Sequence, residues 1–436
     1  MSENKKDKRF FTIGGVFFLL IVIPLSLMAF LIANGMFKLG VTIKERTVTV
    51  LDEKAQEEIK ARAINTANEV AGFLTQSKKD LLVATIIPST KDAYRKFVLE
   101  NRKTLWIRDG KKIKQVSVPL YKEMVLVDRN GREIIKIADG KIVPADKLVN
   151  VSIPANTTYK SENYFARTKA LNKGEVYVSP VTGWYVNRKA FEEGARFSGI
   201  VRFATPLFDK AGFSGIIMLA LDYRHLAQFT NQIIPTQSEK VFEVDASAGN
   251  YSYMVDHRGF VIVHPNSYHI AGLNRRGQQI PALTEKNAQA MIDKGIEVLN
   301  LRQLAFMDPN LPVITEEAEA GKHGIVRYKF AGHDKLVAYA PINFSAANLR
   351  FPPGFGWVGM GVDVNKFKET AAAVSENIDK EAKAWTATII FILILSMIIL
   401  FLIMWLLVRG ISRSLMAEIP EGSEGPLSFD DDDDED

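Results

Sequence analysis

The residue types that carry catalytic chemistry are sparse in this sequence. There is no cysteine, which excludes disulfides, thiolate metal sites, iron–sulfur clusters and cysteine nucleophiles. The six histidines are scattered, and none follows a metal-binding spacing such as His-Glu-x-x-His. No Gly-x-Ser-x-Gly elbow and no phosphate-binding glycine loop occurs. The sequence therefore predicts no catalytic residue, no metal site and no cofactor, and we expect that the protein is not an enzyme.

Charged and aromatic side chains indicate two alternative ligand chemistries instead. Carboxylates beside an aromatic wall suit a cationic amine. Glu162, Tyr164, Phe165 and Asp222 carry such groups, and the family resemblance described below implies that they lie together. Guanidinium groups suit an organic anion, and the candidates are Arg167, Arg188, Arg196 and Arg202. Structural roles compete with these, because Asp222 can cap a helix that starts near Tyr223, and the two aromatic residues can belong to the core.

Two sequence patterns occur twice and predict two similar antiparallel-sheet modules. A Val-Asp-x-x-Gly hairpin signal lies at 127–131 and again at 255–259, with the aspartate expected to stabilise the turn. A pair of strands ending in aspartate lies at 203–222 and again at 339–363. Each sheet needs a helical cover on its apolar face. We expect a long helix over 42–82 to cover one sheet and a helix over 284–306 to cover the other. A shorter helix, capped by Ser89 or Thr90, is expected through Val98.

Two apolar segments bracket these modules. Residues 10–37 contain no charge and would form about 42 Å of helix, enough to cross a hydrocarbon core of ~30 Å. Residues 384–408 form the second such run. Bases precede the first span and follow the second, which predicts that both termini are cytoplasmic. The net charge is +5, but the last nineteen residues contain ten acids and no base, so the rest of the chain carries about +15. These bases are dispersed, and nucleic-acid binding is not implied.

In their order and spacing, these features resemble the double Cache sensor domains of bacterial transmembrane receptors. The segments that carry the resemblance are 127–131, Tyr164-Phe165, Val176-Tyr177-Val178-Ser179-Pro180, 206–222 and 255–265. The resemblance implies an α+β fold, with a long stalk helix and two PAS-like modules between two membrane helices, and it adds Tyr177 to the expected ligand-binding residues. Amino-acid-binding relatives carry Arg-x-aromatic-aromatic where this sequence has Glu162-Asn163-Tyr164-Phe165. The carboxylate clamp is therefore missing, which favours an amine or an anion bound from another direction.

The predicted organisation follows from these assignments. The expected parts are a cytoplasmic N-terminus (1–9), a first span (10–37), a stalk with the membrane-distal module (38–235), a membrane-proximal module (236–363), a juxtamembrane helix (364–383), a second span (384–408) and an acidic cytoplasmic tail (409–436). We expect a sensor in the bacterial inner membrane whose residues 38–383 are extracytoplasmic. It would signal through its spans to a separate cytoplasmic protein, with homodimerisation through the juxtamembrane helix as one option. The alternatives are a module that docks another envelope protein without a small ligand, and a receptor fragment that lacks its output domain.

Overall fold

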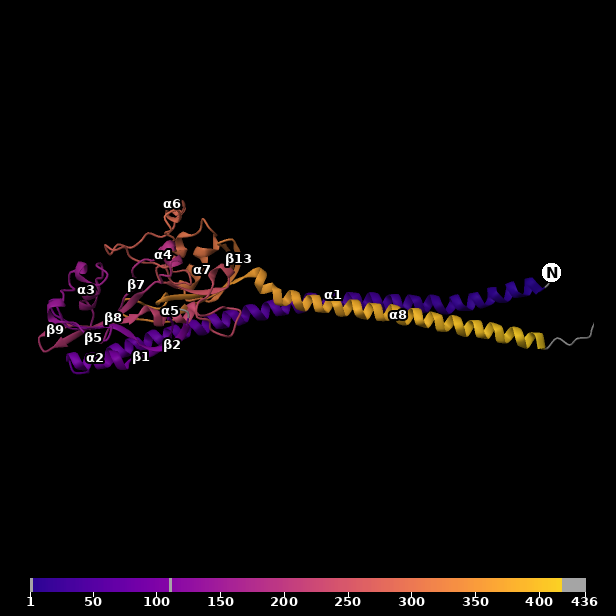
Figure 1. Ribbon diagram of the computed structural model, residues 1–436, viewed down its shortest axis with the longest axis horizontal. Coiled ribbons are helices and arrows are strands. Elements are labelled where there is room, and N and C mark those ends of the chain that lie inside the picture. The colour runs from indigo at the N-terminus through magenta and orange to yellow at the C-terminus, as the bar shows by residue number, and fades with distance from the viewer. Residues whose placement is uncertain (1–2, 110–111, 418–436) are drawn as a thin grey trace, which may run out of the picture. The chain divides into compact units, whose positions relative to one another are not determined.

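The computed structural model describes residues 3–109 and 112–417, which divide into two compact units. Met1–Leu51 and Thr370–Asp436 form one, here called the helix-pair unit, and Asp52–Glu369 form the other, the sheet unit. The sheet unit contains two antiparallel sheets and several helices, so the α+β prediction is confirmed. Two helices belong to both units: α1 (Glu3–Ala84) and α8 (Val364–Ala417) (Figure 1).

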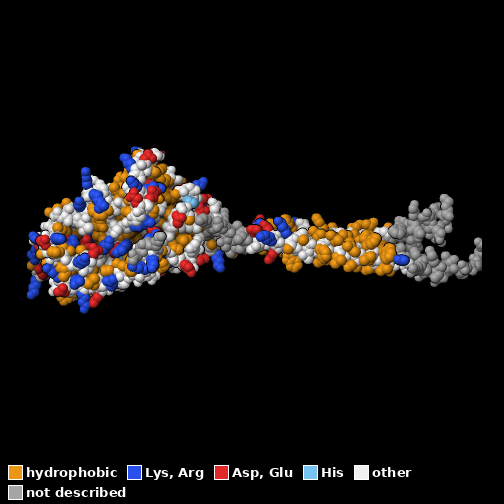
Figure 2. Space-filling view, viewed as in Figure 1, with side chains coloured by type: hydrophobic (Ala, Val, Ile, Leu, Met, Phe, Trp, Pro, Cys, Tyr) orange, Lys and Arg blue, Asp and Glu red, His pale blue; other side chains and the backbone are white. Residues whose placement is uncertain are grey.

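Within the helix-pair unit, α1 and α8 lie side by side. The rings of Phe18 and Phe401 have centroids 6.0 Å apart, and Lys44 Nζ lies 2.6 Å from Asp379 Oδ2. Phe18–Arg46 and Glu376–Leu407 contain 18-residue windows with mean hydropathies of 2.3 and 3.2, and both are long enough to cross a membrane. Their hydrophobic side chains form a continuous belt in Figure 2. Both expected membrane helices are therefore present as candidates. Most of the predicted acidic tail, 418–436, lies outside the described residues, as do the side chains of 1–14 and 366–375.

The first module is a seven-stranded sheet in the order β5-β4-β3-β9-β8-β6, with β7 also paired to β8. Its strands are β3 (Tyr121–Asp128), β4 (Glu133–Ala138), β5 (Lys141–Ile142), β6 (Tyr177–Val178), β7 (Thr182–Gly183), β8 (Gly199–Asp209) and β9 (Gly212–Asp222). The second module is a five-stranded sheet in the order β11-β10-β14-β13-β12. Its strands are β10 (Tyr251–Asp256), β11 (Val261–Val263), β12 (Gly324–Phe330), β13 (His333–Ile342) and β14 (Gly356–Asp363).

The internal repeat predicted from the sequence is visible in the backbone. Gly215 near the start of β9 and Gly356 at the start of β14 adopt φ angles of +153° and +145°. A Cβ at either position would lie 2.1 or 2.0 Å from the carbonyl oxygen of Val127 or Val255, respectively, on the neighbouring hairpin strand. Both modules thus use a glycine where the last strand passes closest to the Val-Asp turn. In both turns the aspartate accepts backbone N–H groups, as expected.

One continuous core joins helix α1 to both sheets. Buried α1 residues from Ile59 to Ala84 belong to the same apolar cluster as β3, β9, β10 and β14 side chains. Helix α2 (Lys91–Glu100) starts at Thr90, whose hydroxyl accepts Ala93 N–H, which confirms the predicted cap. Helix α5 (Tyr223–Asn231) follows the first module and starts at the cap Asp222.

The predicted helical cover over 284–306 is wrong. The structure places the short α6 (Ala288–Ile292) and a 3-10 turn (Leu301–Gln303) there, and α7 (Asn310–Glu319) packs on β12, β13 and β14 instead. Gly295 has φ +68°, and the residues after it are drawn into extended pairing, with Val261 N–H bonded to Leu299 O and Leu283 N–H to Val298 O. A backbone used in this way cannot continue a helix. A hairpin of β1 (Arg102–Asp109) and β2 (Lys112–Pro119) was not predicted either.

Candidate functional site

The sheet unit holds a cavity of about 180 Å³ that both modules line. The first module contributes residues from the segment before α3 (Tyr164–Lys169), from β6 and β7, and from β8. The second module contributes its first hairpin turn and the segment after it. The lining residues are Ser161, Glu162, Asn163, Tyr164, Tyr177, Ser179, Pro180, Val181, Thr182, Gly183, Arg202, Arg258, Ala271, Gly272, Leu273 and Gln279. The volume is similar to that of an engineered protein cavity of about 150 Å³ that holds benzene, so a small molecule of about that size fits.

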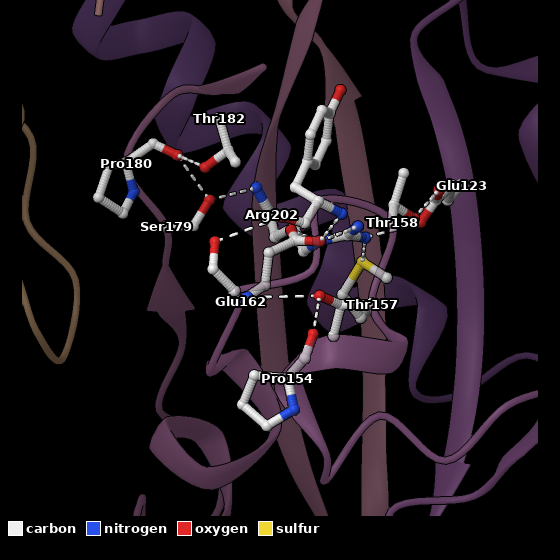
Figure 3. Close-up of polar contacts among 12 residues, drawn as sticks. Glu123, Pro154, Thr157, Thr158, Glu162, Ser179, Pro180, Thr182 and Arg202 are labelled. Carbon is white, nitrogen blue, oxygen red and sulfur yellow. Dashed lines mark hydrogen bonds and ion pairs between the residues drawn. The ribbon is translucent and has the colours of Figure 1, made fainter. Parts of the chain in front are cut away.

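Glu162 and Arg202 of the cavity lining form a buried group of three charges with Glu123, which is not itself a lining residue (Figure 3). Arg202 lies between two carboxylates, with its Nη1 atom 2.7 Å from Glu123 Oε2 and its Nε atom 2.5 Å from Glu162 Oε1. The guanidinium carbon lies 4.8 Å from the centroid of the Tyr164 ring. We call Glu123, Glu162 and Arg202 the charge triad. Their side chains are only 13%, 7% and 1% exposed, respectively, so water screens them weakly.

The local fold fixes each member of the triad. Glu123 and Arg202 are on β3 and β8, the two neighbours of β9, and Arg202 pairs in register with Ala220 of that strand. Glu162 accepts Tyr159 N–H, and Glu123 accepts the Thr158 hydroxyl, so the segment before α3 holds both carboxylates in place. Ser179 Oγ accepts Arg202 N–H and donates to Pro180 O. Every charged group therefore has hydrogen-bond partners, as burial requires.

The charges of the triad do not cancel. Burial raises the pKa of the Glu123 carboxyl, but attraction to Arg202 and Lys136 outweighs that effect and holds the pKa at about 2. Burial lowers the pKa of Arg202, and the two carboxylates outweigh it and hold the pKa above its ordinary value. The nearby Lys136 is itself paired with Glu133 at 2.8 Å. Two carboxylates thus share one guanidinium, and one negative charge remains beside the cavity.

The second module contributes a charged residue, Arg258, to the lining of the cavity. Arg258 donates from Nε and Nη2 to Asp256 Oδ2, at 2.8 and 2.6 Å, and its side chain is 37% exposed. Asp256 also accepts two backbone N–H groups of its own turn, so the Arg258 side chain is held in a fixed direction. Tyr177 lies within electrostatic reach of both Glu162 and Arg258, and burial together with Glu162 raises the pKa of its hydroxyl. The lining therefore contains Glu162 and Arg202 from the first module and Arg258, paired with Asp256, from the second.

The structure brings together some of the residues predicted to bind a ligand and separates the others. Glu162, Tyr164, Tyr177 and Arg202 all line the cavity. Phe165 is buried in an apolar cluster against Phe213, and Arg167 is exposed on α3. Asp222 caps α5 and binds Arg224 at 2.7 Å, which is the structural alternative named above.

The other two arginine candidates join the modules. Arg188, on α4 (Arg188–Glu192), binds Glu297 at 2.6 Å, and Arg196 binds Glu243 at 2.6 Å. Tyr185 Oη, in the loop between β7 and α4, donates to Tyr268 O and accepts Glu297 N–H. This loop therefore bonds to the second module.

Glu123 and Arg258 were not predicted as ligand-binding residues, whereas Arg202 was. Arg202 stands alone among apolar residues of its strand, as Val-Arg-Phe-Ala, whereas Glu123 follows a lysine, as Lys-Glu-Met-Val. A lone charge in such a run is a sequence signal for a buried partner of opposite sign. Arg258 carries no comparable signal, because its place at the cavity depends on how the second module packs against the first.

Comparisons with known proteins give a family and several similar folds. The family model dCache_1, described as Cache domain, matches residues 44–366. The domain of a Vibrio parahaemolyticus protein assigned to the sensory box/GGDEF family is 14% identical, with 74% of this chain and 100% of that chain covered and a TM-score of 0.43.

Two chemoreceptor ligand-binding domains are also similar. PctB of Pseudomonas aeruginosa, solved with L-Arg, is 13% identical over 72% of this chain and 97% of its own, with a TM-score of 0.39. CtaA of Pseudomonas fluorescens, solved with L-leucine, is 13% identical over 75% and 98%, with a TM-score of 0.37. A comparison with curated proteins found no match.

Proposed function

The chain belongs to the dCache_1 family of Cache domains, and from this premise we propose that it is a membrane-anchored extracytoplasmic sensor whose cavity binds a small amine-bearing molecule. The observation that carries the proposal is the cavity that both modules line, to which a buried charge triad of net charge −1 contributes Glu162 and Arg202. A cationic group that enters the cavity would compensate this charge in a site of low exposure, where the attraction is strong.

The polarity of the cavity narrows the ligand class further. The ammonium group would lie against Glu162, near the ring of Tyr164 and the hydroxyl of Tyr177. Arg258, from the second module, has Nη1 free of the Asp256 bond, so a second, acceptor-bearing end of the ligand can bind there. An organic anion bound to Arg202, the alternative raised by the sequence, would have to compete with two carboxylates that already hold this guanidinium.

The direct test is thermal unfolding of the full chain in lipid nanodiscs with defined probes. Putrescine, cadaverine and L-lysine serve as cationic probes, and succinate and L-malate serve as anionic ones. At a hundredfold excess over Kd, binding adds about 2.7 kcal/mol to the free energy of unfolding. We expect the melting temperature to rise with cationic probes only. Thr182→Trp fills the cavity and should abolish the rise, whereas Thr104→Trp, on the exposed face of β1, should leave it intact.

The other outcomes identify the alternatives. A rise with succinate or L-malate alone would replace the amine by an organic anion. No response to any probe, together with capture of a single envelope protein, would favour docking without a small ligand.

We further propose that the sheet unit faces the outside of the bacterial inner membrane and signals through α8 to a separate cytoplasmic protein, with both chain termini cytoplasmic. The bases that flank the two apolar segments support this orientation. Residues 38–383 should then be digested when intact spheroplasts are treated with protease. Protection of this region until the cells are lysed would contradict the orientation.

A further inference from the structure

A segment of the second module completes the edge of the first module's sheet, directly behind the cavity. Strand β6 pairs with β8 on one side only. On its other side, Val178 N–H donates to Asn348 Oδ1 at 2.9 Å, and Asn348 Nδ2 donates to Val178 O at 2.8 Å. Ala347 N–H adds a bond of 2.9 Å to Val176 O. The side-chain amide of Asn348 thus takes the place of a neighbouring strand, because it offers one donor and one acceptor as a peptide group does.

The contact between Asn348 and Val178 lies next to the cavity. On one side of Val178 is Tyr177 and on the other is Ser179, and both line the cavity. Asn348 lies in the connection between β13 and β14, and β14 ends at Asp363, which accepts Asn365 N–H at the start of α8. Strand β14 is buried along its whole length and is paired on both sides. A displacement of β6 can therefore be transmitted through Asn348 and the rigid strand β14 to α8, the helix that continues into the candidate membrane span.

The connection between β13 and β14 is anchored by buried side chains. Phe344 is 2% exposed and packs edge-on against Phe203 of β8, with ring centroids 6.5 Å apart. Ala346 and Leu349 are buried in the core shared with α1. Asn348 itself is exposed, so its replacement leaves no cavity and exposes no apolar surface.

We propose that Asn348 is the coupling residue that transmits the state of the cavity wall to α8. The two hydrogen bonds to Val178 make β6 and the β13–β14 connection move together, so that a change at Tyr177 and Ser179 reaches Asp363 and α8. This role goes beyond ligand recognition and does not depend on the identity of the ligand. A coupling residue is distinguished from a structural one by an energetic link between the two sites.

The absence of cysteine allows a direct measurement. A Cβ at Gly40 would lie 3.3 Å from Ala382 Cβ, close to the usual separation in a disulfide. The full chain with Gly40→Cys and Ala382→Cys, in native membranes, reports the position of α8 against α1 as a rate of oxidative cross-linking. Thr182→Trp perturbs the cavity wall without any ligand. Asn348→Ala breaks the contact, and Asn343→Ala, an exposed asparagine in the same connection for which the described residues offer no hydrogen-bond partner, is the matched control.

We expect Thr182→Trp to change the cross-linking rate at least threefold in the parent and in the Asn343→Ala background, and by less than 1.5-fold with Asn348→Ala. Asn348→Asp, which keeps the acceptor for Val178 N–H and loses the donor, should give an intermediate response. An undiminished response with Asn348→Ala overturns the proposal, and its loss with Arg188→Gln instead would assign the coupling to the Arg188–Glu297 contact. The absence of a response in the parent overturns the proposal as well.

Discussion

Removing one carboxylate of the charge triad is the most informative perturbation of the proposed site. Glu123→Gln keeps the shape of the side chain and leaves Arg202, which is 1% exposed, with Glu162 as its remaining carboxylate partner. Attraction to Arg202 and Lys136 lowers the pKa of Glu123 from 4.5 to about 2 against the effect of burial. At 1.36 kcal/mol for each pH unit, this corresponds to roughly 3 kcal/mol of folding free energy. Loss of one partner from a buried ion pair costs a similar amount, about 3–5 kcal/mol.

The contribution of Glu123 to the free energy of unfolding should depend on pH in a definite direction. A carboxyl group whose pKa is lower in the folded protein stabilises the fold above its ordinary pKa, and this stabilisation is lost as the pH falls from about 4.5 towards 2. The difference in unfolding free energy between the parent and Glu123→Gln should therefore be about 3 kcal/mol at pH 6 and narrow to about 1 kcal/mol at pH 3.

Thermal unfolding of the full chain in nanodiscs, followed by tryptophan fluorescence, measures this difference. About 3 kcal/mol lowers the melting temperature at pH 6 by roughly 5 to 10 °C. The matched control is Arg129→Gln, because Arg129 and Asp209 form an exposed pair in the same sheet, with side chains 54% and 48% exposed. Such a pair contributes under about 1 kcal/mol. If Glu123→Gln costs no more than this control, or if the difference is equal at pH 6 and pH 3, the triad is not the buried charge site described here.

Three further substitutions test other parts of the fold by the same unfolding measurement. Gly356→Ala should cost more than about 2 kcal/mol because its Cβ would meet Val255 O at 2.0 Å, whereas Gly212→Ala, with open space around it, should cost about 1 kcal/mol. Burial lowers the pKa of Lys335 from 10.5 to about 7, against the attraction of Asp363. The unfolded chain then binds more protons between these values, so stability should rise from pH 7 to pH 9.5, and Lys335→Met should remove that rise. Thr90→Ala should cost about 1 kcal/mol through the lost cap of α2, and a cost near zero would contradict the capping role.

The parts of the fold that depend only on neighbouring residues could be predicted from the sequence. The Val-Asp-x-x-Gly turns, the caps at Thr90 and Asp222 and the long first helix each depend on a few neighbouring residues, and the structure confirms them. The helix expected over 284–306 failed because its apolar spacing is also compatible with extended pairing. Val261 and Leu283 hold residues 298–299 in that extended form. Such a competition is decided by tertiary contacts, which local propensity does not contain.

In the candidate site, too, the sequence indicated individual residues but not the tertiary contacts between them. Glu162 was read as a replacement for an arginine that would bind a carboxylate, and Arg202 as a separate anion-binding candidate. In the structure Glu162 and Arg202 form an ion pair with each other, so the two predicted features belong to one charge cluster. Residues 40 positions apart meet because β8 lies beside the segment that precedes α3, and register rather than sequence distance decides this. Because Glu123 adds a second carboxylate, the same arrangement that satisfies Arg202 also leaves the negative charge on which the proposal of a cationic ligand rests.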